Sequence, residues 1–350
     1  VSGQFMLASL PAAFRDIIPR YLPNVLLPVK GQSVKQDFNF DIDFKNMSAF
    51  TENFLPDLYL DPSSRLKGQI NSDSRNFDVS FNSSDFRYAN FKLTNLDLKV
   101  AAENNAMKVA LRSDTLYYTS SGYIPDFSIN ALAMDNRVDF LLRLADQSGQ
   151  PNRLRWAGHC NFATYNEAAL TIDSSDVTID AKPWAILADN KVEFGKTGTH
   201  LINIGLKHDD EFVGIDGWVS RDSTKQLGIN FNDFSLSHLN AALNALNTRF
   251  GGATTGSATL TDLYADLRLE TNLNVQGMII NSDTVGNASF ITGYDTKSNS
   301  LFINADVIKG TAKIITIAGN YRFDDKVNAF DFDIKTDNFY LHTIDRKSVV

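Results

Sequence analysis

Few residues of this 350-residue chain combine the type and the spacing that catalysis would need. His159 lies beside Cys160, the single cysteine, and an imidazole next to a thiol is the pairing that activates a sulfur nucleophile. On a strand, however, adjacent side chains point to opposite faces, and no third group that would orient the histidine can be identified. The sequence therefore argues against a cysteine nucleophile at this point.

Carboxylates that share a face are the next candidates for chemistry. Asp41 and Asp43 alternate with apolar residues, as do Asp331 and Asp333, so each pair would lie on one side of a strand. A calcium loop would need a different spacing and a glycine, so we interpret both pairs as a solvated outer face. The remaining histidines show no metal-ligand spacing; they are His200, His208, His238 and His342. We expect no catalysis, no cofactor and no metal.

The elements that carry these residues are strands, because an apolar and polar alternation of period two runs through most of the chain. It places large apolar side chains on one face and Asn, Asp, Ser or Lys on the other. The residues that we predict to line this apolar face are Phe38, Phe40, Ile42, Phe44, Phe77, Val79, Phe81, Leu227, Ile229, Phe231, Leu301, Ile303, Phe330, Phe332 and Ile334.

Composition limits the class of protein. With 43% hydrophobic and 21% charged residues the chain is globular, and no apolar run is long enough to span a bilayer as a helix. The net charge of −8 argues against a nucleic-acid partner, which would require clustered Lys and Arg. The chain starts at Val1 without an initiator Met or a secretory signal, and we expect it to be a fragment of a longer protein.

Turn and breaker residues predict the organisation of the chain. Residues 1–35 are broken by four prolines and are expected to form a helical or connecting segment, followed by a continuous array of amphipathic strands over 36–350. A possible break lies near 146–153, and leucines spaced by three and four predict a short helix over 236–247, with Ser235 and Ser237 as candidate caps. Polar clusters predict turns; they include Asn82-Ser83-Ser84, Asn104-Asn105 and Asp209-Asp210.

Several weak motifs together resemble a known family. Two glycine-marked strands, 66–70 and 318–321, each lead into further alternating strands, and Phe231-Asn232-Asp233-Phe234 enters the leucine-rich helix. A glycine-rich return follows at 251–258. Over much of residues 36–345 the chain resembles the AsmA-like group of envelope proteins, and most closely the translocation and assembly module (TamB) family of bacteria with two membranes.

The resemblance implies a nonenzymatic scaffold or lipid conduit that spans the periplasm. It implies an elongated, curved antiparallel sheet or open groove that binds acyl chains along its apolar interior. It also implies phospholipid or another acyl lipid as cargo, and a β-barrel protein of the outer-membrane assembly machinery as partner. Anchorage to the inner membrane would come from a segment absent from this sequence.

Physical arguments support this hypothesis and one alternative. An apolar strip could hold a lipid without polar ligands, since each acyl CH₂ removed from water gains about 0.8 kcal/mol. Large open apolar sheets aggregate unless a ligand, a lid or a closed core covers them, and single phenylalanines on strands usually serve as core. The alternative is therefore an extracellular β-rich adhesin or glycan-binding module with a closed core, in which sugars would stack on Trp156, Trp184, Trp218, Tyr117 or Tyr118.

Overall fold

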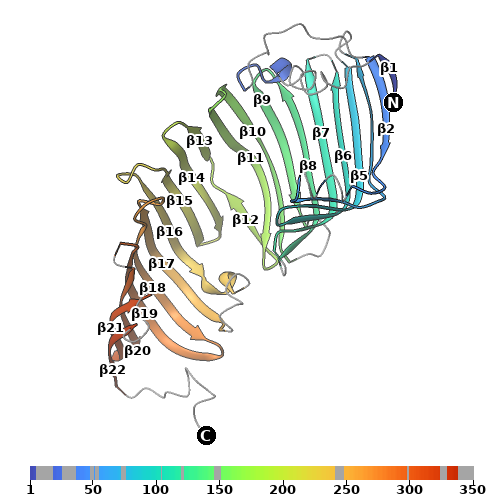
Figure 1. Ribbon diagram of the computed structural model, residues 1–350. Coiled ribbons are helices and arrows are strands. Elements are labelled where there is room, and N and C mark those ends of the chain that lie inside the picture. The colour runs from blue at the N-terminus through green and yellow to red at the C-terminus, as the bar shows by residue number, and fades with distance from the viewer. Residues whose placement is uncertain are drawn as a thin grey trace. The chain divides into compact units, whose positions relative to one another are not determined.

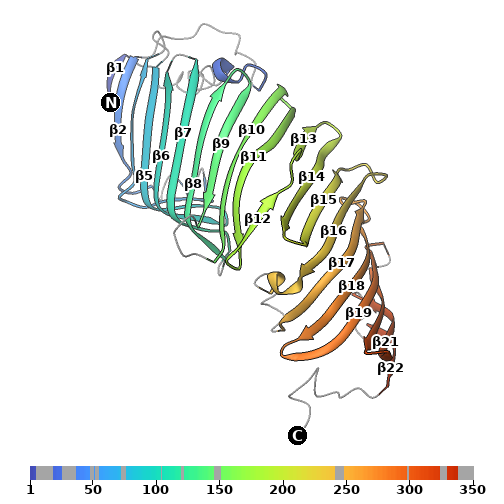
Figure 2. The ribbon, with the colours of Figure 1, turned by 180° about the vertical axis from the view of Figure 1, so that it is seen from behind.

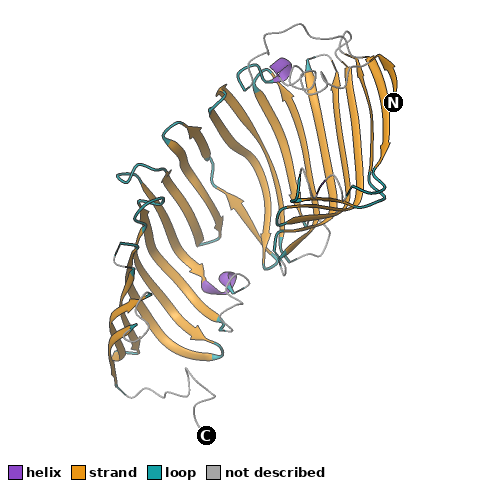
Figure 3. Cartoon of the chain, viewed as in Figure 1, coloured by secondary structure: helices purple, strands orange, loops and turns teal. Residues whose placement is uncertain are grey.

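The computed structural model describes residues 1–4, 19–25, 37–47, 51, 55–71, 76–103, 105–119, 122–145, 151–240, 248–297, 299–323 and 329–337. These residues form 22 strands, paired antiparallel, with one short 3₁₀ helix, η2 (Leu236–Leu239), and helical residues at 19–21 and Thr51 (Figure 3). The predicted all-β class, an antiparallel sheet of many amphipathic strands with short helices, is confirmed. Two compact units divide between Pro183 and Trp184, within β12 (Lys182–Ile186).

Most strands of the N-terminal unit pair with their neighbours in the chain (Figures 1 and 2). Its strands are β1 (Ser2–Gln4), β2 (Asp37–Asp43), β3 (Leu58–Leu60), β4 (Arg65–Asn71), β5 (Asn76–Tyr88), β6 (Phe91–Glu103), β7 (Ala106–Tyr117), β8 (Tyr123–Met134), β9 (Arg137–Leu144), β10 (Arg153–Thr164) and β11 (Glu167–Ile179). β4 and β3 pair with successive parts of the long strand β5. The predicted connecting segment 1–35 thus contributes strand β1, which pairs with β2.

The C-terminal unit continues the same nearest-neighbour pairing. Its strands are β13 (Lys191–Gly195), β14 (Gly198–His208), β15 (Glu211–Val219), β16 (Gln226–Ser235), β17 (Phe250–Thr261), β18 (Arg268–Ile280), β19 (Asp283–Asp295), β20 (Ser300–Lys309), β21 (Ala312–Arg322) and β22 (Phe330–Thr336). The predicted helix begins at Leu236 as a 3₁₀ turn, while residues 241–247 lie outside the described residues. Ser235 stands at its N-cap without a side-chain cap bond, because its Oγ contacts the Oγ of Ser237 at 2.7 Å.

The break predicted near 146–153 does not divide the units. Strands β9 and β10 flank the undescribed residues 146–150 and pair with each other, with Leu144 opposite Leu154. The turn predicted at Asn82-Ser83-Ser84 is also wrong, because these residues lie inside β5. The predicted turn at Asp209-Asp210 joins β14 to β15 as expected.

The polar residues inside the long strands change which side chains face the apolar side. Asn95 and Asp126 adopt left-handed backbone conformations, with φ of 47° and 51°. Asn95 shifts the alternation of β6 by one position between Leu93 and Leu98. These leucines lie directly opposite Phe86 and Phe81 of β5, whose ring centroids are 6.1 Å apart although one residue number is even and the other odd. Buried Ser113 lies beside this interruption and donates its hydroxyl to the carbonyl oxygen of Thr94 at 2.6 Å. The hydroxyl thereby satisfies a buried backbone acceptor.

Candidate functional site

One face of the N-terminal sheet is apolar across nine consecutive strands. Residues directly opposite in an antiparallel pair share a face, so the register traces rows of side chains across the sheet. Three such rows cross from β2 to β10 or β11: Phe38, Ile70, Phe77, Ala102, Met107, Ala133, Val138, Cys160 and Leu170; Phe40, Gly68, Val79, Val100, Val109, Ala131, Phe140, Gly158 and Ile172; and Ile42, Leu66, Phe81, Leu98, Leu111, Ile129, Leu142 and Trp156.

The C-terminal unit carries an apolar face of the same construction. Its rows are Val192, Leu201, Gly217, Leu227, Leu260, Leu269, Tyr294, Leu301, Tyr321 and Phe330; Ile204, Ile215, Ile229, Ala258, Thr271, Thr292, Ile303, Gly319 and Phe332; and Leu206, Val213, Phe231, Gly256, Leu273, Phe290, Ala305, Ile317 and Ile334. The hydroxyls of Thr271 and Thr292 lie 2.6 Å apart, so that one donates to the other within the row.

The register places the residues predicted for the apolar face in these rows. Seven of them belong to the N-terminal unit and eight to the C-terminal unit. Phe44 follows β2 directly, and its ring lies 6.3 Å from that of Phe81. The sequence pattern did not identify the glycine and alanine members, such as Gly68 and Ala102, because small residues carry little periodic signal.

Most of the apolar face is only partly buried. Phe38, Phe40 and Ile70 form a buried cluster, whereas Val109 and Ile129 in the same rows remain partly exposed. In the C-terminal unit, Phe330 is 74% and Ile334 59% exposed. A closed sandwich core would bury such residues on both sides, so the described residues leave apolar surface accessible on each unit.

A short segment covers one end of the N-terminal apolar face. Tyr21 and Leu22 are buried against Ala102 and Ala133, whose small side chains leave room for them. The backbone amide of Asn24 donates to Oδ1 of Asn136 at 2.6 Å, and the Asn24 side-chain amide donates to the carbonyl oxygen of Phe162 at 3.0 Å. Residues 19–25 are therefore fixed at this position by both packing and hydrogen bonds.

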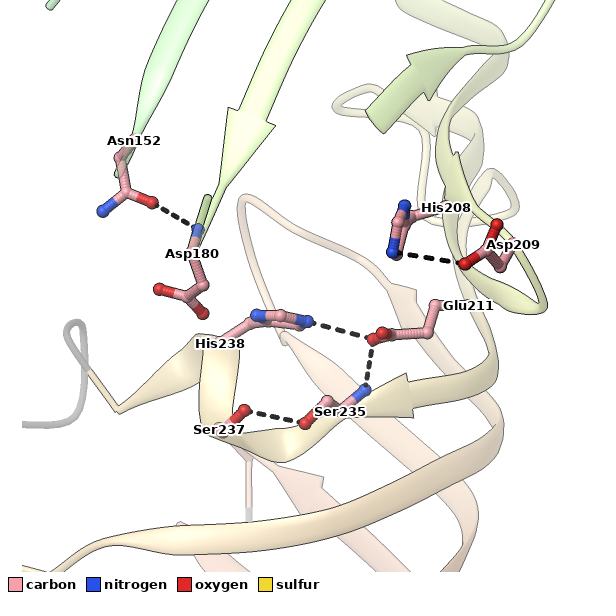
Figure 4. A network of polar contacts seen from close by, with 8 residues as sticks. All are labelled: Asn152, Asp180, His208, Asp209, Glu211, Ser235, Ser237 and His238. Atoms are coloured by element: carbon pink, nitrogen blue, oxygen red, sulfur yellow. Dashed lines mark hydrogen bonds and ion pairs between the residues drawn. The ribbon is translucent and has the colours of Figure 1, made fainter. Parts of the chain in front are cut away.

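Helix η2 plays the corresponding role in the C-terminal unit. Leu236 packs on a buried cluster that includes Val275 and Ile315. The Nε2 atom of His238 lies 3.0 Å from the Glu211 carboxylate, which also accepts the backbone amide of Ser235 at 3.1 Å (Figure 4). These contacts lie next to buried Trp184, whose ring centroid is 5.4 Å from that of His238.

The opposite face of each sheet is polar. Arg65 donates two hydrogen bonds to Asp41, at 2.7 and 2.6 Å, and lies 3.2 Å from Asp43. The guanidinium holds the pKa of the Asp41 carboxyl below its ordinary value. Asp331 and Asp333 are exposed on the same kind of face. Both carboxylate pairs therefore lie on a solvated outer face, as expected.

His159 and Cys160 lie on different faces. His159 pairs its Nδ1 with Asp173 at 2.8 Å on the polar face, whereas Cys160 stands between Val138 and Leu170 in an apolar row. Burial raises the pKa of the Cys160 thiol, which disfavours the thiolate. The imidazole therefore does not activate this sulfur in the structure.

Two of the aromatic residues considered as sugar platforms, Trp184 and Trp218, are in contact with other rings or charged groups of the chain. Trp184 is 3% exposed, and Trp156 belongs to an apolar row. The His200 ring stacks on Trp218 with centroids 4.2 Å apart, and Lys225 Nζ lies over the same indole at 4.2 Å. Both groups therefore compete with a sugar for contact with the Trp218 ring. Tyr118 remains exposed.

In the described part of the chain, no helix is long and apolar enough to cross a bilayer. Among the same residues, no three His, Cys, Asp or Glu side chains gather where they could hold a metal ion. No family model matches the chain, and neither the curated proteins nor the solved structures give a match.

Proposed function

We propose that this protein binds acyl chains along its apolar faces, as a nonenzymatic lipid conduit or scaffold. The observation that carries the proposal is the set of apolar rows that cross each unit, with Thr271 and Thr292 as polar members of one row, and that remain partly exposed in the described residues. Each acyl CH₂ placed on such a surface gains about 0.8 kcal/mol, and no polar ligand is needed. A contiguous exposed apolar surface of this kind normally marks a binding site.

The resemblance to the TamB family gives the proposal a biological setting. Under it, the protein lies in the periplasm of a bacterium with two membranes, and phospholipid moves along the apolar faces between the membranes. A β-barrel protein of the outer-membrane assembly machinery would be its partner. The burial of Trp184 and the contacts of His200 and Lys225 with the Trp218 ring weaken the alternative of a glycan-binding adhesin, since sugar stacking requires an accessible ring face.

The first test is native mass spectrometry, with solvent extraction, of the chain purified after incubation with vesicles of phosphatidylethanolamine and phosphatidylglycerol. We expect phospholipid to be bound at a reproducible ratio. A lipid-free mass under conditions that preserve the fold would overturn the proposal.

Adjacent residues of β20 provide matched variants. Ile303 lies on the apolar face and Asn304 on the exposed polar face, so Ile303→Asp should reduce lipid binding while Asn304→Asp should not. Circular dichroism checks that each variant keeps its strands, because a carboxylate on a buried surface is costly. If Ile303→Asp fails to fold, the uncharged, β-branched Ile303→Thr replaces it. Equal lipid retention by folded Ile303 and Asn304 variants would contradict the proposed site.

A further inference from the structure

One end of the N-terminal sheet carries aromatic side chains on both of its faces. It is the end where β5 turns into β6 and β7 leads into β8, with β3 paired to the last residues of β5. Successive residues of a strand point to opposite faces, so the last two cross-strand rows lie on opposite faces. One row is Leu58, Tyr88 and Phe91, and the other is Tyr59, Arg87, Lys92, Tyr117 and Tyr123. We call these two rows, together with Tyr118, the aromatic end.

The rings of the aromatic end are accessible to solvent. Tyr88 is 54%, Phe91 52% and Tyr123 61% exposed, and Tyr59 and Tyr118 are exposed as well. A single exposed ring needs no explanation, whereas five at one end of one sheet form the kind of patch that marks an interaction surface.

Two cations lie among the rings of the second row. The guanidinium carbon of Arg87 lies 4.9 Å from the centroid of the Tyr59 ring, and Lys92 Nζ lies 5.6 Å from that of Tyr117. Both cations also contact the Asp85 carboxylate, at 2.7 and 3.3 Å. Phenol rings and long cationic side chains have an apolar body and a polar tip, which suits them to the boundary between water and hydrocarbon.

The opposite ends of the same strands are built differently. There β8 turns into β9 through Asp135 and Asn136, and residues 19–25 pack against Ala102 and Ala133. The aromatic end is therefore the end of these strands that lies away from this cover.

We propose that the aromatic end inserts into the headgroup region of a lipid bilayer. A protein partner docks on one face of a sheet, but rings on both faces fit a medium that surrounds the strand ends on all sides. Arg87 and Lys92 limit the depth to the interface, since a charged side chain is costly in hydrocarbon. Asp85 compensates part of their charge, and Asp57 is exposed just before β3. Partition of the rings, rather than attraction to anionic headgroups, therefore drives the contact.

Flotation of the purified chain with phosphatidylcholine vesicles tests the proposal. We expect the wild type to float with these uncharged vesicles and to do so almost equally at high salt. Phe91→Ser and Tyr123→Ser should each weaken vesicle binding by about tenfold, because each removes one ring from the interface. The matched control is Tyr165→Ser, since Tyr165 is 73% exposed in the turn between β10 and β11, at the opposite end of the sheet. It should float like the wild type.

The outcome does not depend on the proposed acyl-chain function, because flotation measures attachment to the bilayer and native mass spectrometry measures lipid removed from it. Ile303→Asp, on the apolar face of the other unit, should still float. Circular dichroism checks the fold of every variant. The proposal is refuted if folded wild-type protein stays in the dense fraction, or if Tyr165→Ser loses binding as much as Phe91→Ser and Tyr123→Ser. Flotation only with phosphatidylglycerol vesicles at low salt would also overturn it, since charge would then drive the contact.

Discussion

Single residues in left-handed conformations determine which side chains reach the apolar face. Asn95 and Asp126 in the N-terminal unit, and Asn203 and Asp233 in the C-terminal unit, have φ between 45° and 53°. Each interrupts the alternation within a long strand. Asparagine and aspartate tolerate this conformation better than other residues except glycine, whereas β-branched residues are strained in it.

The conformation of Asn95 leads to a stability prediction with its own control. Asn95→Val should lower the free energy of unfolding by about 1–3 kcal/mol, because valine is strained at this positive φ. Asn95→Gly removes the same side-chain bond to Asp114 without that strain, and should stay within about 0.5 kcal/mol of wild type. Urea denaturation compares the two. Equal losses would show that the side-chain bond, rather than the backbone, determines the effect.

Asp85 makes one contribution to stability dependent on pH. Hydrogen bonds from Arg87, at 2.9 and 2.7 Å, together with nearby Lys92, lower the pKa of the carboxyl below its ordinary value of 3.8. The folded state thus favours the charged form. The stabilisation is complete above the ordinary pKa and is lost as the pH falls through the lowered pKa of the folded state.

Asp85→Asn should therefore cost at most about 1 kcal/mol near neutral pH and almost nothing in strong acid. Urea midpoints measured across the acid range check this, with Asp78→Asn on the exposed face of the same strand as control. A difference between Asp85→Asn and wild type that persists unchanged into strong acid would contradict the assignment.

At the scale of elements, the faces of the strands were predictable but their lengths were not. The alternation of period two predicts that Phe77, Val79 and Phe81 share the apolar face, since strand geometry alone places alternate side chains on one side. The polar residues Ser83 and Ser84 predict a turn, yet they lie inside β5. In β6, which pairs with β5, Leu93 and Leu96 are three residues apart instead of two, and this spacing indicates a strand that continues past an interruption. The same spacing separates Phe231 from Phe234 on either side of Asp233.

The covers of the apolar faces, and which side chains lie opposite each other, could not be predicted from the sequence. Tyr21 packs against Ala102 and Ala133, which lie far from it in the chain. An alanine in a strand gives no sequence signal that another segment packs on it. Arg143 and Arg155 lie opposite each other only because of the register of β9 and β10. The alternation of apolar and polar residues predicts the face on which a side chain lies, but not which residue lies opposite it on the next strand.

Helix η2 depends on His238 for its position. His238→Ala removes the partner of the Glu211 carboxylate and the ring beside Trp184, and should cost about 2 kcal/mol, since a buried charged acceptor loses a bond. We expect the tryptophan emission to shift to longer wavelength as Trp184 gains solvent. Leu239→Ala, at the more exposed end of the helix, is the control and should leave the emission unchanged. No spectral change in His238→Ala would mean that other contacts hold the helix.

At the scale of the whole molecule, each unit contains its own buried clusters. Phe38, Phe40 and Ile70 belong to the N-terminal unit, and a larger cluster that includes Val275 and Ile315 belongs to the C-terminal unit. Stability in such a chain is local, because most contacts of a strand are with its immediate neighbours.

A buried charge in one cluster should therefore unfold one unit and spare the other. Ile70→Asp should remove amide protection from the strands near β4, and Ile315→Asp from those near β21, while the other unit keeps its exchange rates. Hydrogen exchange with mass spectrometry measures both units in one experiment. Loss of protection throughout the chain in either variant would show a single cooperative structure.

The nearest-neighbour order of the strands also affects how the chain acquires its structure. From β5 to β11, and again from β13 to β22, each new strand pairs with the one just before it. Most of the loops that must close are short, so contact order is low for an all-β protein and little entropy is lost before most pairings form. An emerging chain already contains the template for its next strand. Folding can thus proceed from the N-terminus during synthesis, with only the newest edge exposed to incorrect pairing.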